Sequence, residues 1–168
     1  MIADLSYFLL ELIQNSIEAD AKQIRICVKS DGGTHRVTVS DDGRGMDEEA
    51  LLQIEKKEYI TKEGNRGKGL YLAASQAEGF EVKSKKGEGT EIRFTLRSMP
   101  VGNVGLTVCT ALAGAPRTDI ELSHSLFGKE IRFSTERLKA ELSVESLENA
   151  DVLFFVKSCL AEQYENFL

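Results

Sequence analysis

The spacing of apolar and polar residues divides the first hundred positions into short helices and hairpins. Residues 2–19 are rich in Leu, Ile, Glu and Gln and lack Gly and Pro, which predicts a helix. Residues 23–30 and 36–40 alternate and are rich in Ile and Val, so they predict two strands joined by the turn at 31–33. Residues 47–57 predict a second helix, with acidic residues in its first turn as the helix dipole favours.

A segment without regular hydrophobic spacing follows, and after it the order of one helix and two strands recurs. Residues 58–67 are charged and glycine-containing and predict a mobile loop. A short helix is expected from residue 68 to about residue 78, ended by Gly79, and strands are expected at 80–84 and 90–97 with a turn at 85–89. This order predicts the α+β class, with helices on one face of a mixed, mostly antiparallel sheet.

A domain boundary is predicted at residues 98–100, which gives a first domain of residues 1–97 and a C-terminal extension of residues 98–168. In the extension, helices are expected at 104–113, 135–142 and 151–167, and a hairpin at 119–127 and 129–133. About seventy residues are marginal for an independent fold, so we expect the extension to pack on the first domain or on a partner protein. The apolar residues available for this packing are Leu106, Val108, Leu112, Leu153, Phe154, Val156 and Phe167.

Composition narrows the classes of protein. With 168 residues, 42% hydrophobic and 29% charged, the chain can form one domain, or one domain with an appendage. The net charge of -6 disfavours a nucleic-acid partner. The absence of a long apolar run and of a basic N-terminal region predicts a cytoplasmic protein without a membrane partner. Three scattered cysteines and two histidines predict neither a disulfide framework nor a zinc site.

Three polar residues share one side of the first predicted helix. Glu11, Asn15 and Glu18 are spaced i, i+4 and i+7, so they lie close together around the helix. One interpretation is a solvated stripe on an amphipathic helix. The other is a ligand site, because Asn and Glu oxygens suit Mg²⁺ and a nearby carboxylate can orient a water or a hydroxyl.

Glycine-rich segments follow three of the other elements. Residues 41–46 (DDGRGM) close a strand, either as a tight turn or as a place where a carboxylate accepts from an exocyclic amine such as that of adenine. Residues 64–70 (GNRGKGL) open a helix, either as a flexible loop or as a phosphate site at the helix N-terminus. Residues 87–90 (GEGT) alone indicate a hairpin turn.

The order of these motifs is more specific than any one of them. The runs Glu11–Ser16, Asp41–Gly45, Gly67–Leu70 and Gly87–Thr90 resemble the ATP-binding superfamily of gyrase, the large heat-shock chaperone, histidine kinases and MutL (GHKL). The resemblance covers residues 1–97. It implies a Bergerat-type α/β sandwich in which Mg²⁺ and ATP lie between the helical layer and a flexible lid, here residues 58–66.

The resemblance also implies a role for each matched residue. Glu11 would be the general base. The nucleotide-binding residues would be Asn15, Asp41, Gly43, Gly45, Met46, Lys62, Arg66, Gly67, Lys68, Gly69, Leu70 and Thr90. Among them, Asn15 would coordinate Mg²⁺ and Asp41 would accept from the adenine amine with support from Thr90. Gly43 and Gly45 would let the base approach, and residues 67–69 would hold the phosphates.

Two features of larger members of the superfamily do not match this sequence. We expect no helical dimerisation domain with a phosphoacceptor histidine before the module, and no transducer domain with a catalytic lysine after it. His35 and His124 are therefore expected to be ordinary packed or surface residues. The whole chain resembles small stand-alone bacterial members with a similar short extension.

Three functions remain open at this point. The first is an ATP-binding regulatory protein with weak ATPase activity, and the second is a protein kinase that acts in trans on a Ser or His, as anti-sigma-factor kinases do. The third is a scaffold whose nucleotide site has decayed. Glu11 favours the first two, and four intact motifs argue against the third. The expected partners are ATP, an unidentified protein and a second copy of the chain.

Overall fold

The computed structural model describes residues 4–56 and 68–168, which form six strands and six helices. The strands are β1 (Gln23–Asp31), β2 (Thr34–Asp41), β3 (Glu78–Lys85), β4 (Gly89–Leu96), β5 (Asp119–Leu126) and β6 (Lys129–Ser134). The helices are α1 (Leu5–Glu18), α2 (Glu48–Glu55), α3 (Lys68–Gln76), α4 (Val104–Gly114), α5 (Thr135–Leu142) and α6 (Ala150–Phe167). The predicted α+β class is confirmed.

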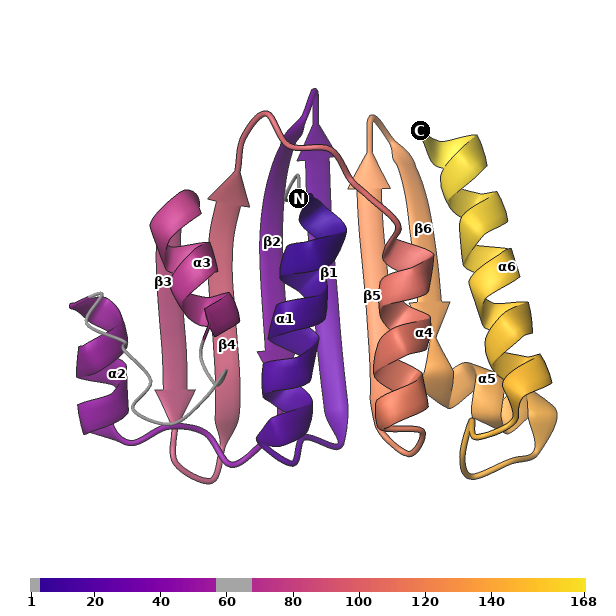
Figure 1. Ribbon diagram of the computed structural model, residues 1–168, viewed down its shortest axis with the longest axis horizontal. Coiled ribbons are helices and arrows are strands. Elements are labelled where there is room, and N and C mark those ends of the chain that lie inside the picture. Colours follow the sequence, from indigo (N-terminus) through magenta and orange to yellow (C-terminus); the bar gives the residue numbers. More distant parts are fainter. Residues whose placement is uncertain (1–3, 57–67) are drawn as a thin grey trace.

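All the described strands belong to one sheet, in the order β3-β4-β2-β1-β5-β6 (Figure 1). Its pairs are antiparallel except for β1 and β5, which run parallel with Gln23 opposite Asp119. The sheet is therefore mixed and mostly antiparallel, as expected. Because β5 pairs directly with β1, the residues after the predicted boundary extend the same sheet.

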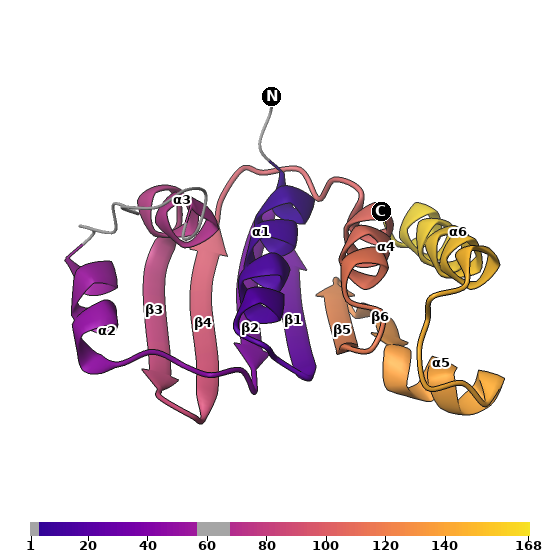
Figure 2. The ribbon, with the colours of Figure 1, turned by 60° about the horizontal axis from the view of Figure 1, so that its bottom comes forward.

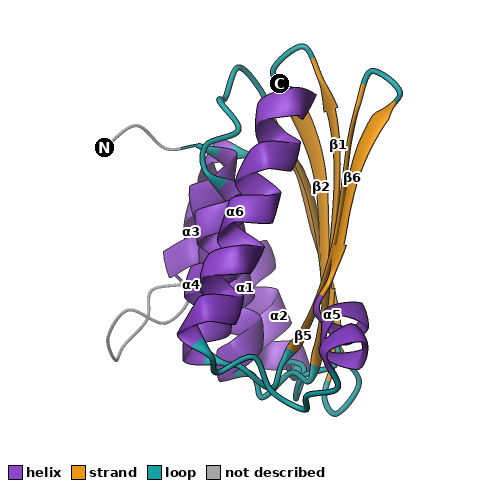
Figure 3. Cartoon of the chain, turned by 90° about the vertical axis from the view of Figure 1, so that its right-hand side faces the viewer, coloured by secondary structure: helices purple, strands orange, loops and turns teal. Residues whose placement is uncertain are grey.

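The helices form a layer on one face of the sheet. Figure 2 shows α3, α1, α4 and α6 side by side above the strands, and α1 contacts both α3 and α4 while α4 contacts α6. Figure 3 shows α5 on the opposite side, at one end of the sheet. None of the helices within residues 4–56 and 68–168 combines the length and the apolar character needed to cross a membrane.

One hydrophobic core joins the two layers. The strands alternate, so that in β1 the side chains of Ile24, Ile26 and Val28 are buried under the helices. The same cluster contains Leu12 from α1 and Leu112 from α4. The core therefore runs without a break from the first hundred residues into the extension.

Helix α1 is fixed at its start. Asp4 is its N-cap, and the Asp4 carboxylate accepts a hydrogen bond from the Tyr7 backbone N–H at 2.9 Å. The Leu5 N–H donates to the Pro100 carbonyl at 2.9 Å, so the segment after β4 ties down the same end. These bonds, with the buried apolar face of α1, fix which side of the helix meets β2 and α3.

The predicted end of the third helix is wrong. We expected a helix to about residue 78 with Gly79 as its stop, but α3 ends at Gln76 and β3 starts at Glu78. Gly79 has a φ of 59° and lies where the register between β3 and β4 shifts. Its positive φ thus serves a β-bulge and not a helix C-cap, two uses of glycine that look alike in sequence.

The apolar residues of the extension divide into two groups. Val108, Leu112, Val156 and Phe167 are buried in the common core, and Leu153 packs partly against it. Leu106 is 47% exposed and Phe154 70% exposed, so these two do not pack on the core, and of the two expected alternatives only packing on a partner stays a prediction for them. Both occupy the outer sides of their helices, where the rest of the fold does not reach.

Candidate nucleotide-binding site

A pocket lies between α1, the end of β2 and the start of α3. Six of the residues singled out by the sequence line it, namely Asn15, Asp41, Gly45, Met46, Leu70 and Thr90. They come from α1, β2, the segment after β2, α3 and β4, so the fold brings together motifs that are up to 75 positions apart. Leu12 and Ile92 give the pocket an apolar wall that suits a planar ring.

The carboxylate of Asp41 is held in one orientation by two donors. The Ser16 hydroxyl donates to Asp41 Oδ2 at 2.7 Å, and the Gly43 N–H donates to Oδ1 at 2.9 Å. Ser16 is buried, and it lies one position after Asn15 on α1. A carboxylate oxygen can accept more than one hydrogen bond, so Asp41 keeps acceptor capacity toward the pocket.

Asn15 carries an unsatisfied polar atom at this pocket. Its Nδ2 atom is buried and has no hydrogen-bond partner among the described residues. Buried polar groups in folded proteins nearly always have partners, so this amide fits a site that a ligand completes. Rotation of the amide by 180° exchanges its nitrogen and oxygen, and an amide oxygen is a donor that Mg²⁺ accepts.

The Asn15 amide could supply one oxygen ligand to a magnesium ion bound in this pocket. No group of three or more His, Cys, Asp and Glu side chains within residues 4–56 and 68–168 could hold a metal ion. The phosphate oxygens of a nucleotide would be the other ligands, which is the usual arrangement for Mg²⁺ in nucleotide sites.

Gly43 and Gly45 are packed tightly against the backbone of other segments. A Cβ on Gly43 would stand 2.7 Å from the Ala19 carbonyl oxygen. A Cβ on Gly45, whose φ is 66°, would overlap the carbonyl oxygen of Lys85 and stand 2.7 Å from its carbonyl carbon. Contacts with α1 and the β3–β4 hairpin thus require both glycines, whether or not a base also lies near them.

Thr90 and Met46 are linked through a residue that the sequence did not single out. The Ser84 and Thr90 hydroxyls are 2.8 Å apart, and the Met46 N–H donates to Ser84 Oγ at 2.9 Å. Thr90 also lies directly opposite Asp41 in the pairing of β4 with β2. Ser84 therefore links two residues that line the pocket, Met46 and Thr90.

Glu11 lies one helical turn before Asn15 and is not among the residues that line the pocket. Its carboxylate accepts a hydrogen bond from Tyr7, one turn earlier. Burial, together with the charge of Glu11 and this hydrogen bond, raises the pKa of Tyr7. Glu11 thus shares α1 with Asn15, but its carboxylate interacts with Tyr7 outside the lining of the pocket.

The remaining expected residues are only partly covered by the structure. Lys68 and Gly69 form the start of α3, where the first backbone N–H groups have no partner within the helix, and the next residue, Leu70, lines the pocket. Lys62, Arg66 and Gly67 lie outside the described residues, as does the lid expected at 58–66.

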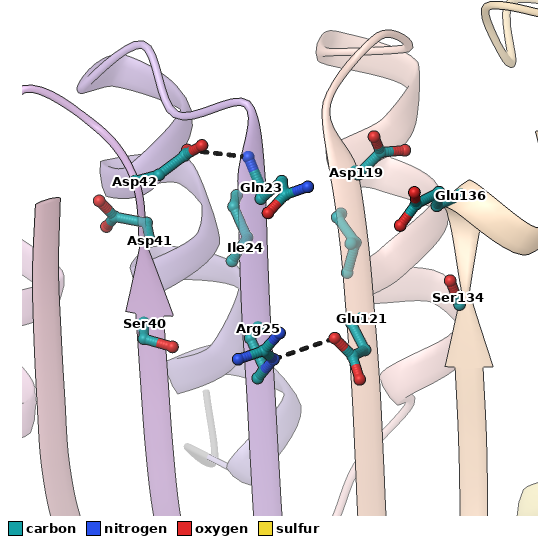
Figure 4. Close-up of a pocket in the computed structure, with 11 residues that line it drawn as sticks. Gln23, Ile24, Arg25, Ser40, Asp41, Asp42, Asp119, Glu121, Ser134 and Glu136 are labelled. Atoms are coloured by element: carbon teal, nitrogen blue, oxygen red, sulfur yellow. Dashed lines mark hydrogen bonds and ion pairs between the residues drawn. The ribbon is translucent and has the colours of Figure 1, made fainter.

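A second hollow, at one end of the sheet, has the wrong charge for a nucleotide (Figure 4). It is lined by five carboxylates, those of Asp41, Asp42, Asp119, Glu121 and Glu136. Its one basic side chain, Arg25, is already paired with Glu121 at 2.9 Å. A triphosphate would be repelled here, so the pocket at Asn15 is the better candidate.

Ser16 and Ser84 are the site residues that sequence reasoning missed. Ser16 belongs to the first motif, and its place directly after Asn15 was the available signal. Ser84 had no such signal, because its role arises only from the pairing of β3 with β4.

The comparison with protein families agrees with this geometry. The family of histidine kinase-, DNA gyrase B- and HSP90-like ATPases matches residues 2–100, which is more than half of the chain. The chain therefore belongs to this family and contains a GHKL-type ATPase domain, the class of domain that binds ATP, usually with Mg²⁺.

Similar curated proteins include the DNA mismatch repair protein MutL of Halobacterium salinarum, 32% identical over 133 residues, or 71% of this chain and 19% of MutL. MutL of Trichlorobacter lovleyi is 34% identical over 140 residues, which are 73% of this chain and 22% of that protein. The sensor protein LytS of Bacillus subtilis is 30% identical over 97 residues, or 49% of this chain and 16% of LytS. The chain thus spans about a fifth of the length of these relatives.

Among solved structures, the Aquifex aeolicus MutL ATPase domain complexed with ADP aligns with a TM-score of 0.47 and 17% identity. The alignment covers 86% of this chain and 71% of that one.

Proposed function

We propose that this protein is a regulatory Mg-ATP-binding protein with weak ATPase activity, and that nucleotide binding changes the surface it offers to a partner. The observation that carries the proposal is that one pocket contains both the oriented carboxylate of Asp41 and the unpaired amide of Asn15. We propose that it acts in the cytoplasm. We also propose that it binds a protein partner and a second copy of the chain.

Asp41 would recognise the base. Its two oxygens already accept hydrogen bonds from Ser16 and Gly43, so the group acts as an acceptor toward both neighbours. Such a group matches the exocyclic amine of adenine and repels the carbonyl that guanine carries at the same position. Thr90, opposite Asp41 in the neighbouring strand, would support the same contact.

Asn15 and the start of α3 would hold the phosphates. Asn15 would share Mg²⁺ with them, and the ion would neutralise part of their charge. The first N–H groups of α3, at Lys68 and Gly69, would donate to phosphate oxygens, helped by the helix dipole. We propose Lys62, Arg66 and Gly67 as further contacts, supported only by their place in the motifs.

Glu11 would act as the general base. It lies on α1 one turn from Asn15, so a water held between the two side chains would be close to bound phosphate. The same carboxylate could instead activate a hydroxyl of a protein substrate, which is the kinase alternative. Both forms of turnover need Glu11, whereas a passive scaffold does not.

Incubation with Mg²⁺ and γ-labelled ATP, with and without cell lysate, separates these functions. We expect slow release of labelled phosphate from the protein alone, and its loss in Glu11→Ala while ATP binding persists. Glu162→Ala, on the exposed surface of α6, is the matched control and should turn over ATP like the wild type. Label on a lysate protein instead of free phosphate would favour the kinase, and unchanged turnover in Glu11→Ala would refute the assignment of the base.

A further inference from the structure

A chain of buried hydrogen bonds crosses the sheet far from the nucleotide pocket. Ser30 of β1 lies 2.6 Å from His35 Nδ1 on β2 and 2.6 Å from His124 Nε2 on β5. His35 Nε2 is 2.7 Å from the Met99 carbonyl oxygen, and His124 Nδ1 is 2.9 Å from the Tyr164 hydroxyl on α6. His35 is 2% exposed and His124 is fully buried, so the three bonds that join Ser30, the two imidazoles and Tyr164 are shielded from water.

The number of available protons fixes the direction of every bond in this chain when both imidazoles are neutral. The Met99 carbonyl can only accept, so His35 Nε2 carries the proton and His35 Nδ1 must accept from the Ser30 hydroxyl. Ser30 has no second proton, so His124 Nε2 must donate to it. His124 Nδ1 is then an acceptor, and the Tyr164 hydroxyl donates to it.

The opposite tautomer of His124 does not satisfy the chain. If Nδ1 carried the proton, Nε2 would need the Ser30 hydrogen that His35 also needs. The Tyr164 hydroxyl would also lose its acceptor, and no other is found among the described residues. One proton arrangement therefore satisfies all the groups, and it requires two neutral histidines in the Nε2–H form.

The surroundings of His124 are apolar and hold few charges. From α6, the rings of Tyr164 and Phe167 lie against the imidazole, with centroids 5.6 Å and 4.9 Å away. Its neighbours in the sheet are Val28 on β1 and Ile131 on β6. The titratable groups that face it are His35 from β2 and Tyr164 from α6, and no described carboxylate or basic side chain bonds to it.

We propose that this chain of bonds is a pH-sensitive latch, which holds the C-terminal turns of α6 on the sheet while both imidazoles are neutral and releases them in acid. A proton on His124 Nδ1 converts the acceptor of the Tyr164 hydroxyl into a donor. It also places a charge among buried rings, which is costly without a counter-ion. Undocking of α6 relieves both problems, because Tyr164 and the imidazole then reach water.

The buried side chains of α6 are Val156, Leu160, Tyr164 and Phe167. Release would expose the two at its C-terminal end, Tyr164 and Phe167. The other contact of the helix is with α4, where Gly105 leaves so little room that a Cβ would stand 3.2 Å from the Leu160 Cβ. The latch therefore acts on the end of α6 that lies over β5 and β6. Protonation of His124 does not change the packing of α6 on α4.

The size of the effect follows from the titration of His124. Burial, with a smaller contribution from His35, lowers its pKa from 6.5 to about 4. The released helix binds the proton more tightly, so closing becomes less favourable as the pH falls between these two values. One linked proton weakens the closing equilibrium by about 100-fold between pH 7 and pH 4, toward a limit of about 300-fold at lower pH.

Amide hydrogen exchange of the full chain between about pH 7 and about pH 4, corrected for intrinsic rates, tests the latch. We expect the C-terminal turns of α6 to lose about 100-fold of their protection between these pH values, while β2 keeps its own. The matched variant is the latch double variant, His124→Phe/Tyr164→Phe, which replaces both partners of one bond by apolar groups. In this variant the protection of α6 should no longer fall ahead of that of β2.

Two results would overturn the proposal: parallel loss of protection in α6 and β2 of the wild type, or the same early loss in the latch double variant. If the double variant does not fold, imidazole ¹⁵N spectra of the wild type at about pH 7 decide the matter. Both histidines should be in the Nε2–H form, and an Nδ1–H form of either would refute the proton order on which the latch rests.

Discussion

Gly45 offers a test of how tightly the edge of the nucleotide pocket is built. It lines the pocket, and it also meets the β3–β4 hairpin at Lys85 and Gly89. We compare the expected effects of Gly45→Ala and Gly87→Ala on the free energy of unfolding. Both glycines have positive φ, 66° and 83°, but a Cβ on Gly87 would meet nothing within 4 Å.

The expected difference can be worked out from this geometry. An L-residue in the left-handed region costs about 1–2 kcal/mol, and this cost applies to both variants. In Gly45→Ala the new Cβ would also overlap the Lys85 carbonyl oxygen and stand 3.2 Å from that of Gly89. These are backbone atoms, so the hairpin itself must move, and overpacking of this kind adds about 1–3 kcal/mol.

Urea unfolding of the wild type and the two variants measures this difference directly. We expect Gly45→Ala to lower the free energy of unfolding by about 2–5 kcal/mol and Gly87→Ala by about 1–2 kcal/mol. Equal losses in the two variants would show that the contact with the hairpin is unimportant. The need for Gly45 would then have to come from the approach of a ligand.

Two further predictions concern the extension. Burial lowers the pKa of His124 from 6.5 to about 4, so His124 binds a proton more tightly in the unfolded chain than in the folded one. The free energy of unfolding should therefore fall by up to about 3 kcal/mol as the pH drops from 6.5 to about 4. Urea titrations at several pH values measure this loss, and an equal loss in the latch double variant would contradict its assignment to His124. Lys139→Met removes the ion pair of the buried Lys139 with the partly buried Asp119 at 2.8 Å and should cost about 1–3 kcal/mol. Lys85→Met, in the exposed pair with Glu88, should cost under about 1 kcal/mol in the same urea unfolding assay, and similar losses would count against a special role for the Lys139–Asp119 pair.

Local pattern was sufficient to predict much of the fold. Alternation in β1 and β2 predicted the hairpin because each strand buries one face under the helices. The apolar spacing of α1 predicted a helix within a few residues of its observed bounds. The end of α3 could not be placed, since Gly79 is compatible both with a helix stop and with a bulge.

The pairing of strands that are far apart in the chain could not be predicted from the sequence. The parallel pairing of β1 with β5 depends on contacts between residues 96 positions apart, such as Gln23 and Asp119, and no local period encodes it. For the same reason His35 and His124 were expected to be ordinary packed or surface residues, whereas Ser30 joins them in one buried chain.

The candidate site was predicted better by the order of its motifs than by any one of them. Asn15, Asp41 and Thr90 meet in one pocket, although each alone has an ordinary structural explanation. The glycines after Asp41 were assigned to the ligand, but the contacts of Gly43 and Gly45 with the protein's own backbone are a sufficient reason for them. Such contacts depend on which backbone segments the fold brings together.

Calorimetric titration with Mg-ATP tests the central claim most directly. Asp42 provides a matched control for Asp41, because it is the neighbouring carboxylate and lines the acidic hollow but not the nucleotide pocket. We expect the wild type to bind, Asp41→Asn to raise Kd at least about tenfold, and Asp42→Asn to stay within about twofold of the wild type. No binding by the wild type, or a Kd for Asp41→Asn within about twofold of it, would contradict the assignment of this pocket to ATP.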